Sequence, residues 1–236
     1  MSLVIRPAAR PPIPHLTPKW LATSLVYHVF RNANTASLDP VPIIASESIA
    51  MAAMGLFHYA HQIPSLQHPK ILTITSLTQA ITNLTPITLE HSFGEPLMTM
   101  VLLFAKKSLE FLPIIPLFVL SPTAFPIALT NYIKAICWYN LLKKYTPEQI
   151  VLITTVGTAL VLAPTLLLKK LSLSWERWIF LLVSSMAGYL HLIYSVELFT
   201  RLTPEYFTMI NSMKGCVFIF LAYIFFMLGS VVVPLP

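Results

Sequence analysis

Residues 150–168 read IVLITTVGTALVLAPTLLL and contain no charged side chain. A membrane-spanning helix needs about 20 mostly apolar residues, and this stretch approaches that length. A strand of a membrane β-barrel would alternate apolar and polar residues instead. Neither this stretch nor GCVFIFLAYIFFMLG at 215–229 alternates in that way. Because backbone exposed to lipid must satisfy its own hydrogen bonds, the sequence predicts helices as the spanning elements.

The composition of the whole chain agrees with a membrane environment. Of its 236 residues, 56% are apolar and 10% are charged, whereas a soluble domain has about 25% charged residues. The sequence therefore predicts an all-α, polytopic membrane protein with six to eight transmembrane helices. The clearest expected spans are 41–60, 111–130, 149–168, 178–200 and 207–233, and the weaker ones are 20–31, 70–89, 92–105 and 127–142.

Prolines and threonines predict how these helices begin and bend. In YTPEQ, Thr146 is expected to cap a helix with Pro147 at its first position, and Thr203 has the same place in LTPE. Threonines of the stretch 70–89 can return their hydroxyls to carbonyls one turn earlier. Prolines inside apolar runs are expected to kink or break helices, and these are Pro113, Pro116, Pro122, Pro126 and Pro164.

The basic residues favour membrane anchoring over nucleic-acid binding. The net charge is +6, and lysines recur in pairs at the ends of apolar runs. Such lysines extend toward lipid headgroups. The pairs are Lys106–Lys107, Lys143–Lys144 and Lys169–Lys170. Because the span 149–168 has a lysine pair at both ends, the positive-inside rule does not orient it.

The N-terminal 38 residues carry four basic residues and no acid. A basic, acid-free start is typical of organellar targeting, so the mitochondrial inner membrane is the favoured location, with other organellar membranes as the alternative. Prolines in RPAARPPIPHLTP disfavour an amphipathic helix. The expected domains are a basic, proline-rich arm at 1–19 and one transmembrane domain at 20–236.

The sequence contains no phosphate-binding glycine loop, nucleophile elbow or zinc motif, so no enzymatic activity, catalytic residue or cofactor is expected. The histidines His58, His61 and His68 form a cluster near the end of the span 41–60. No further ligand follows at the spacing of a metal site, so an interfacial cluster is favoured over a metal centre.

Charges expected inside the membrane are the candidate site residues, because such charges are functional by default. Glu47 lies among small residues that allow close helix packing. Glu197 and Arg201 are four residues apart with the acid first, which predicts an ion pair along one helix. Lys214 has no local partner, so it is expected to contact substrate or another subunit.

Residues 202–226 read LTPEYFTMINSMKGCVFIFLAYIFF, with Pro204, Asn211 and Lys214 preceding an apolar run. This pattern resembles the penultimate helix of the triose-phosphate-type branch of the drug/metabolite transporter superfamily. The stretch EPLMTMVLLF at 95–104 is similar to an earlier helix of that family. The resemblance implies that Lys214 grips an anionic substrate, with Asn211 in the same motif. Gly215 stands where the family has a second basic residue.

Two classes of function follow from these observations. The first is a non-catalytic membrane subunit of a larger complex, with the lipid bilayer and other subunits as partners and a bound phospholipid as a further candidate. The second is a small-solute transporter of the drug/metabolite type that carries an anionic metabolite, and a pore or a lipid-modifying enzyme comes after both. The chain has six glycines where average usage gives about 16, and it has no GxxxG motif. Because moving helices in transporters use small-residue contacts, this scarcity favours the subunit.

Overall fold

The computed structural model describes residues 13–35, 39–59, 69–84, 124–168, 171–203, 206–207 and 210. Within these ranges every regular element is a helix, which confirms the all-α prediction. The helices are α1 (Ile13–Thr35), α2 (Pro40–Tyr59), α3 (Pro69–Leu84), α6 (Ala124–Leu141), α7 (Pro147–Leu162), α8 (Pro164–Leu168) and α9 (Trp175–Phe199). Because α1 begins at Ile13, residues 13–19 of the expected N-terminal arm belong to a helix.

The start of α7 has the predicted cap. Thr146 Oγ1 accepts a hydrogen bond from Gln149 N at 3.3 Å, and Gln149 Oε1 accepts one from Thr146 N at 3.1 Å. Pro147 occupies the first helical position, where its missing N–H interrupts no helical hydrogen bond. At the second predicted start, Tyr206 N donates to Thr203 Oγ1 at 3.4 Å.

Prolines act as predicted at one site and differently at another. Pro164 separates α7 from α8, which confirms that it breaks the apolar run 149–168. Pro126 instead lies in the first turn of α6, where a proline removes no helical hydrogen bond. Pro113, Pro116 and Pro122 lie outside the described residues.

The hydroxyls of α3 bond back to their own helix as predicted. Thr75 Oγ1 donates to Ile71 O at 2.8 Å, and Ser76 Oγ donates to Leu72 O at 2.9 Å. Both residues are buried against neighbouring helices, so their polar groups are satisfied without water. This bonding allows a threonine-rich segment to form a helix inside the bundle.

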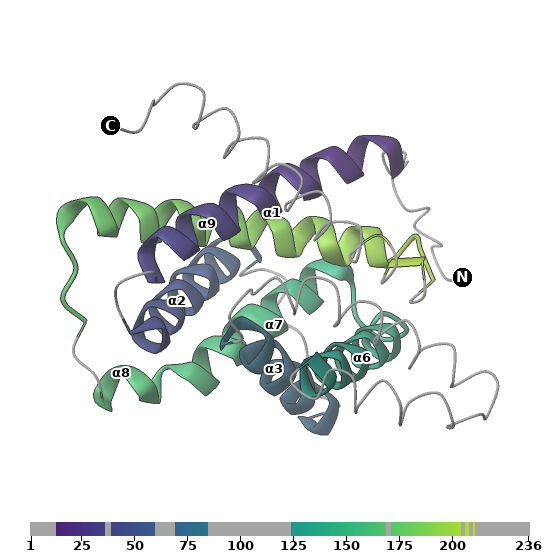
Figure 1. Cartoon of the computed structure of the whole chain (residues 1–236). Helices are drawn as coiled ribbons and strands as arrows, with labels where there is room; N and C mark the ends of the chain where they lie inside the picture. Colours follow the sequence, from purple (N-terminus) through teal and green to yellow (C-terminus); the bar gives the residue numbers. More distant parts are fainter. Residues whose placement is uncertain are drawn as a thin grey trace.

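Two long helices, α1 and α9, lie side by side and run in opposite directions (Figure 1). Trp20 near the start of α1 bonds Ser195 near the end of α9, and Asn34 near the end of α1 bonds Arg177 near the start of α9. Helix α2 packs on α9 and α7, and α3 packs on α7 and α6.

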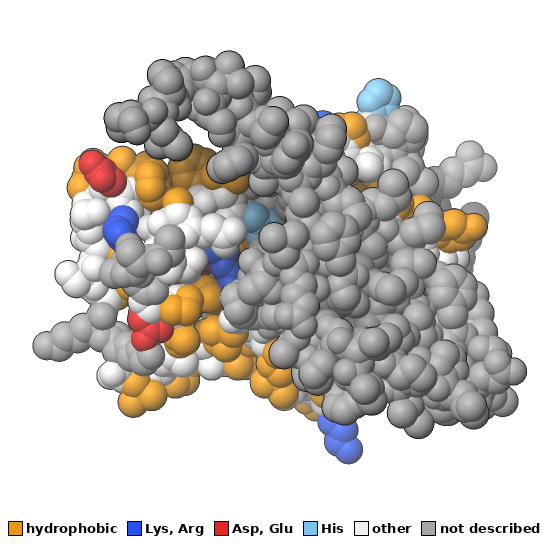
Figure 2. Space-filling model, in the orientation of Figure 1, with side chains coloured by type: hydrophobic (Ala, Val, Ile, Leu, Met, Phe, Trp, Pro, Cys, Tyr) orange, Lys and Arg blue, Asp and Glu red, His pale blue; other side chains and the backbone are white. Residues whose placement is uncertain are grey.

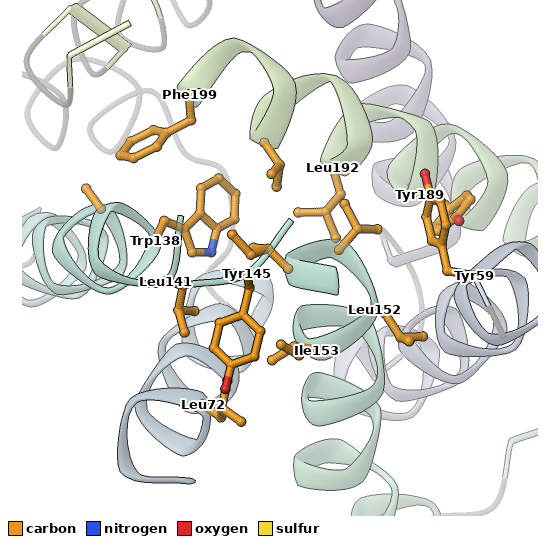
Figure 3. Close-up of a cluster of buried hydrophobic side chains, with 14 residues drawn as sticks. Tyr59, Leu72, Trp138, Leu141, Tyr145, Leu152, Ile153, Tyr189, Leu192 and Phe199 are labelled. Carbon is orange, nitrogen blue, oxygen red and sulfur yellow. The ribbon is translucent and has the colours of Figure 1, made fainter. Parts of the chain in front are cut away.

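The largest apolar core lies where α2, α6 and α9 end and where α3 and α7 begin, and we call this the aromatic end. The Trp138 ring meets the edge of Phe199 with centroids 5.8 Å apart. Tyr145 extends toward Leu72 beside Ile153 (Figure 3). A smaller cluster of Ile44, Ala45, Ala80 and Leu162 joins the other ends of α2, α3 and α7, at what we call the opposite end.

Three helical segments are long and apolar enough to cross a membrane, namely Pro40–Tyr59, Pro147–Leu168 and Trp175–Phe199. They correspond to the predicted spans 41–60, 149–168 and 178–200. On the face drawn in Figure 2, hydrophobic side chains lie along much of the described surface, and charged side chains are scattered.

The predicted total of six to eight spans is not confirmed. Three weaker spans, 20–31, 70–89 and 127–142, correspond to α1, α3 and α6. Helix α3 has 16 residues, and α1 and α6 are less apolar than the three spanning segments. The other predicted spans fall wholly or largely outside the described residues.

Candidate functional site

The described helices bury one cluster of opposite charges, at the place where α1, α2 and α9 meet. It contains Arg31 from α1, Glu47 from α2 and Ser184 from α9. Glu47 is 1% exposed and Arg31 is 8% exposed. Burying such groups away from water is costly unless they contact one another, so their mutual geometry decides what the cluster does.

The carboxylate of Glu47 contacts both of the other helices. Ser184 Oγ donates a hydrogen bond to Glu47 Oε1. Arg31 Nε lies 3.9 Å from Glu47 Oε2, which is an ion pair without a close hydrogen bond. Oε2 accepts no hydrogen bond from the described residues. The carboxylate therefore joins α2 to α9 through a hydroxyl and to α1 through charge.

Tyr27 holds the guanidinium of Arg31 in place. Arg31 Nη1 donates to Tyr27 Oη at 2.5 Å, and the guanidinium carbon lies 5.4 Å from the centre of the Tyr27 ring. The two residues are four apart on α1, which places them on one face of the helix. The hydrogen bond and the cation–π contact both compensate the guanidinium for its burial.

The buried face of α1 is set by its residue spacing. Its buried positions advance by steps of three or four residues, which keeps them on one side of a helix. They are Leu16, Trp20, Ser24, Tyr27, Arg31 and Asn34. This face is covered by α9, the helix on which α1 packs most extensively. The sequence therefore directs a mostly polar stripe of α1 into the protein.

Small residues on α9 allow the close approach. A Cβ atom on Gly188 would lie 2.8 Å from Tyr27 Cε2 and 3.3 Å from Met51 Sδ. Ser184 and Ser185, one turn earlier, are fully buried, and Ser185 Oγ donates to Leu181 O at 2.6 Å. Glycine at 188 thus permits the Tyr27 ring to lie where it supports Arg31.

Further polar contacts extend along the α1–α9 interface on both sides of the cluster. Asn34 Nδ2 donates to Arg177 O at 3.2 Å, and Arg177 Nη1 donates to Asn34 O at 3.4 Å. Toward the aromatic end, Trp20 Nε1 donates to Ser195 Oγ at 2.8 Å and stacks on His191 with centroids 5.5 Å apart. Interhelical contacts of this kind fix helix register in membranes, where apolar contact alone does not distinguish protein from lipid.

Of the predicted site residues, Glu47 lies in this cluster and the Glu197–Arg201 pair lies elsewhere. Arg201 Nη2 is 2.7 Å from Glu197 Oε1, which confirms the predicted ion pair. The pair is at the end of α9, and Glu197 is 13 positions beyond Ser184, or about 20 Å along a helix. The two acids therefore belong to separate sites. Lys214 and Asn211 lie outside the described residues.

Sequence reasoning missed Arg31, Tyr27 and Ser184 as members of the site. Arg31 is one of the four basic residues in the N-terminal 38, which indicated targeting rather than a buried site, and its partner Glu47 lies on another helix. The detectable signal was the spacing from Trp20 to Asn34, which indicates a buried face that includes an arginine. Nothing local predicts Ser184, which is 137 positions from Glu47.

Of the three histidines in the predicted cluster, His58 lies within the described residues. His58 Nδ1 lies 3.1 Å from Tyr189 Oη, which joins the end of α2 to α9. His61 and His68 lie outside the described ranges. Among the residues that the structure describes, no group of three or more His, Cys, Asp or Glu side chains could hold a metal ion.

The charge cluster can tie three helices together. Its acid faces a cation and a hydroxyl, and all three side chains are buried between the helices that carry them. Comparison with known proteins adds no family to this description, because the sequence matches no protein-family model and no curated protein sequence.

Proposed function

We propose that this protein is a non-catalytic, integral membrane subunit that packs within a larger membrane protein complex and stabilises it. The observation that carries the proposal is that the buried charges are paired within the chain. Arg31, Glu47 and Ser184 contact one another and are almost fully buried. A solute could reach them only if α1, α2 and α9 separated, so the cluster serves cohesion of the helices rather than turnover.

The outer surface supplies apolar area for neighbouring subunits as well as for lipid. Phe57 near the end of α2 is 93% exposed, and Leu167 and Leu168 in α8 are 89% and 84% exposed. When a neighbouring subunit covers such exposed apolar side chains, they become buried anchors, and buried anchors dominate contacts between proteins. The basic N-terminal residues favour the mitochondrial inner membrane as the location of this complex.

The test is the native mass of the full chain after mild detergent extraction. The tagged protein should migrate in a large complex and should purify together with the same membrane subunits from independent preparations. Fractionation should place that complex in the mitochondrial inner membrane. Migration as a monomer or dimer after extraction in several mild detergents would reject the subunit proposal.

A small-solute transporter of the drug/metabolite type is the second candidate, and Arg31 favours it. A guanidinium buried among spanning helices is a candidate ligand for an anionic metabolite. In a transporter, the solute would replace Glu47 as the partner of Arg31 when the helices separate. Vesicles that contain the purified protein would then take up anionic metabolites, and Arg31→Gln would abolish uptake. If the protein is a structural subunit only, vesicles with the wild-type protein and vesicles with the Arg31→Gln variant would both show no uptake.

A further inference from the structure

The helix directions gather four segments at the aromatic end. Trp20 lies beside Ser195, so the first part of α1 is near the end of α9. Tyr145 lies beside Leu72, so the α6–α7 connection is near the start of α3 (Figure 3). Trp138 meets Phe199, which joins the end of α6 to the end of α9. Residues far apart in the sequence therefore share one end of the bundle.

Exposed lysines collect at this end from three of these segments. The lysines are Lys19, Lys70, Lys143 and Lys144. The described acids there are Glu148 and Glu197, and Glu197 is paired with Arg201 at 2.7 Å. Among the described residues, this end therefore has more basic groups than acidic ones.

Aromatic side chains place the lysines at the level of lipid headgroups. Lys143 Nζ lies 4.4 Å from the centre of the Tyr139 ring, and Tyr139 is 48% exposed. Tyrosine is enriched at membrane–water interfaces, and lysine extends its charge from that depth into the headgroup layer. This contact favours a position of the Lys143 ammonium group at the depth of lipid phosphates.

The opposite end differs in charge and in aromatic content. It presents exposed Trp175 and Trp178 at the start of α9, where Glu176 and Arg177 lie between them, and Asp39 precedes the start of α2. The described charged residues of this end are therefore of both signs. Helix α9 has 25 residues, or about 37 Å, which is enough to place the two ends in opposite headgroup layers.

We propose that Lys19, Lys70, Lys143 and Lys144 form a docking surface for the headgroups of anionic phospholipids in one leaflet. Ammonium groups bind phosphate as point charges and require no pocket. Clusters of four to eight basic residues next to membrane helices are typical of surfaces that bind anionic lipid. The surface depends on membrane insertion alone, so it stands whether or not the protein is a complex subunit.

The experiment uses the purified full chain in phosphatidylcholine vesicles and measures lipid selectivity by spin-labelled lipids. The protein should associate with labelled phosphatidylglycerol at least about fivefold more strongly than with labelled phosphatidylcholine. The variant with Lys19, Lys70, Lys143 and Lys144 all changed to Gln should show a ratio near one. The matched control, Lys169→Gln with Lys170→Gln, changes the lysine pair that follows α8 in the sequence and should keep the wild-type ratio.

Two further measurements keep the result decisive. In the wild type, selectivity should fall as salt rises from about 0.1 M to about 1 M, because the screening length shortens from about 10 Å to about 3 Å. This arm needs no variant, so it holds even if the lysine variant fails to fold. Inorganic phosphate at matched ionic strength should compete no better than chloride.

Three results would overturn the proposal. The first is a wild-type ratio near one, and the second is full selectivity in the folded lysine variant. The third is displacement of the lipid by low concentrations of inorganic phosphate, which would assign the surface to a soluble anion. Loss of selectivity in the control variant would also overturn the proposal, because it would assign the binding to Lys169 and Lys170 instead.

Discussion

Glu47 and Arg31 show how a single buried charge depends on its partner. Each has several polar contacts, yet removing one partner leaves the other charge buried and uncompensated. In Glu197 and Arg201 the same residue types form a closer pair at a helix end, where Glu197 is partly exposed. The distance between the charges is therefore a poor guide to their energetic weight, and burial is the better guide.

Glu47→Gln should lower the free energy of unfolding by about 3–5 kcal/mol, because Arg31 then stays buried without a counter-ion. Unfolding by a denaturing detergent added to mild micelles measures the change. Replacing both residues, with Arg31→Met and Glu47→Leu, should cost less than Glu47→Gln alone. Glu176→Gln, at an exposed acid of α9, is the control and should change stability by at most about 1 kcal/mol. Equal effects at Glu47 and Glu176 would contradict the buried-pair account.

Gly188→Ala should destabilise the protein by about 1–3 kcal/mol, because the added methyl group meets the Tyr27 ring 2.8 Å away. The same detergent-unfolding assay measures this effect. Met186→Ala, on the exposed side of the same helix, should change stability by about 0.5 kcal/mol or less. A neutral Gly188→Ala would mean that α1 and α9 pack less closely than described.

Arg201→Gln should cost only about 0.3–0.5 kcal/mol, because its ion pair with Glu197 is a partly exposed pair along one helix. Detergent unfolding in low and in high salt tests this. The small cost should shrink further as salt rises. A loss as large as that of Glu47→Gln would show that the pair has a further partner.

At the scale of helices, the sequence predicted where a helix starts or breaks better than it predicted which helices contact one another. The residues YTPEQ predicted the start of α7, Pro164 predicted its end, and the threonines of α3 predicted their own backbone bonds, because all of these interactions are local. The contact between Arg31 and Glu47 was not predicted, since it depends on how the two helices lie. Ser184 was beyond prediction for the same reason.

Thr146→Ala should destabilise the start of α7 by about 1 kcal/mol, because the capping box loses its side-chain acceptor. Hydrogen exchange at the first turn of α7 should rise, while exchange at α9 should not. Thr73→Val is the control, since the exposed Thr73 hydroxyl bonds back to Pro69 O within its own helix. Unchanged exchange at residues 148–150 in the Thr146 variant would reject this assignment.

For the molecule as a whole, apolar length predicted six to eight spans, and three of the predicted spans match described segments that are long and apolar enough to cross a membrane. It did not predict which ends meet, because nothing local indicates that α1 pairs with α9. The contacts Trp20–Ser195 and Asn34–Arg177 supply that information and define the two ends of the bundle. The positive-inside rule can then be applied to an assembled end rather than to one span at a time.

The two ends should lie on opposite sides of the membrane. In a background of Cys137→Ser with Cys216→Ser, Lys143→Cys and Trp175→Cys each provide one thiol for a membrane-impermeant maleimide. In sealed vesicles of uniform orientation, one should react at once and the other only after permeabilisation. Reaction of both from the same side would contradict the arrangement of α6 and α9.

The pairing of α1 with α9 also fixes when this protein can complete its fold during synthesis. Helix α1 leaves the ribosome first, but the helix that covers its polar face is made about 140 residues later. Until then Ser24 and Asn34 lack the helix that buries them, whereas Arg31 can already meet Glu47 on the next helix. The nascent chain can therefore insert α1 and α2 as a charge-paired hairpin that waits for α9.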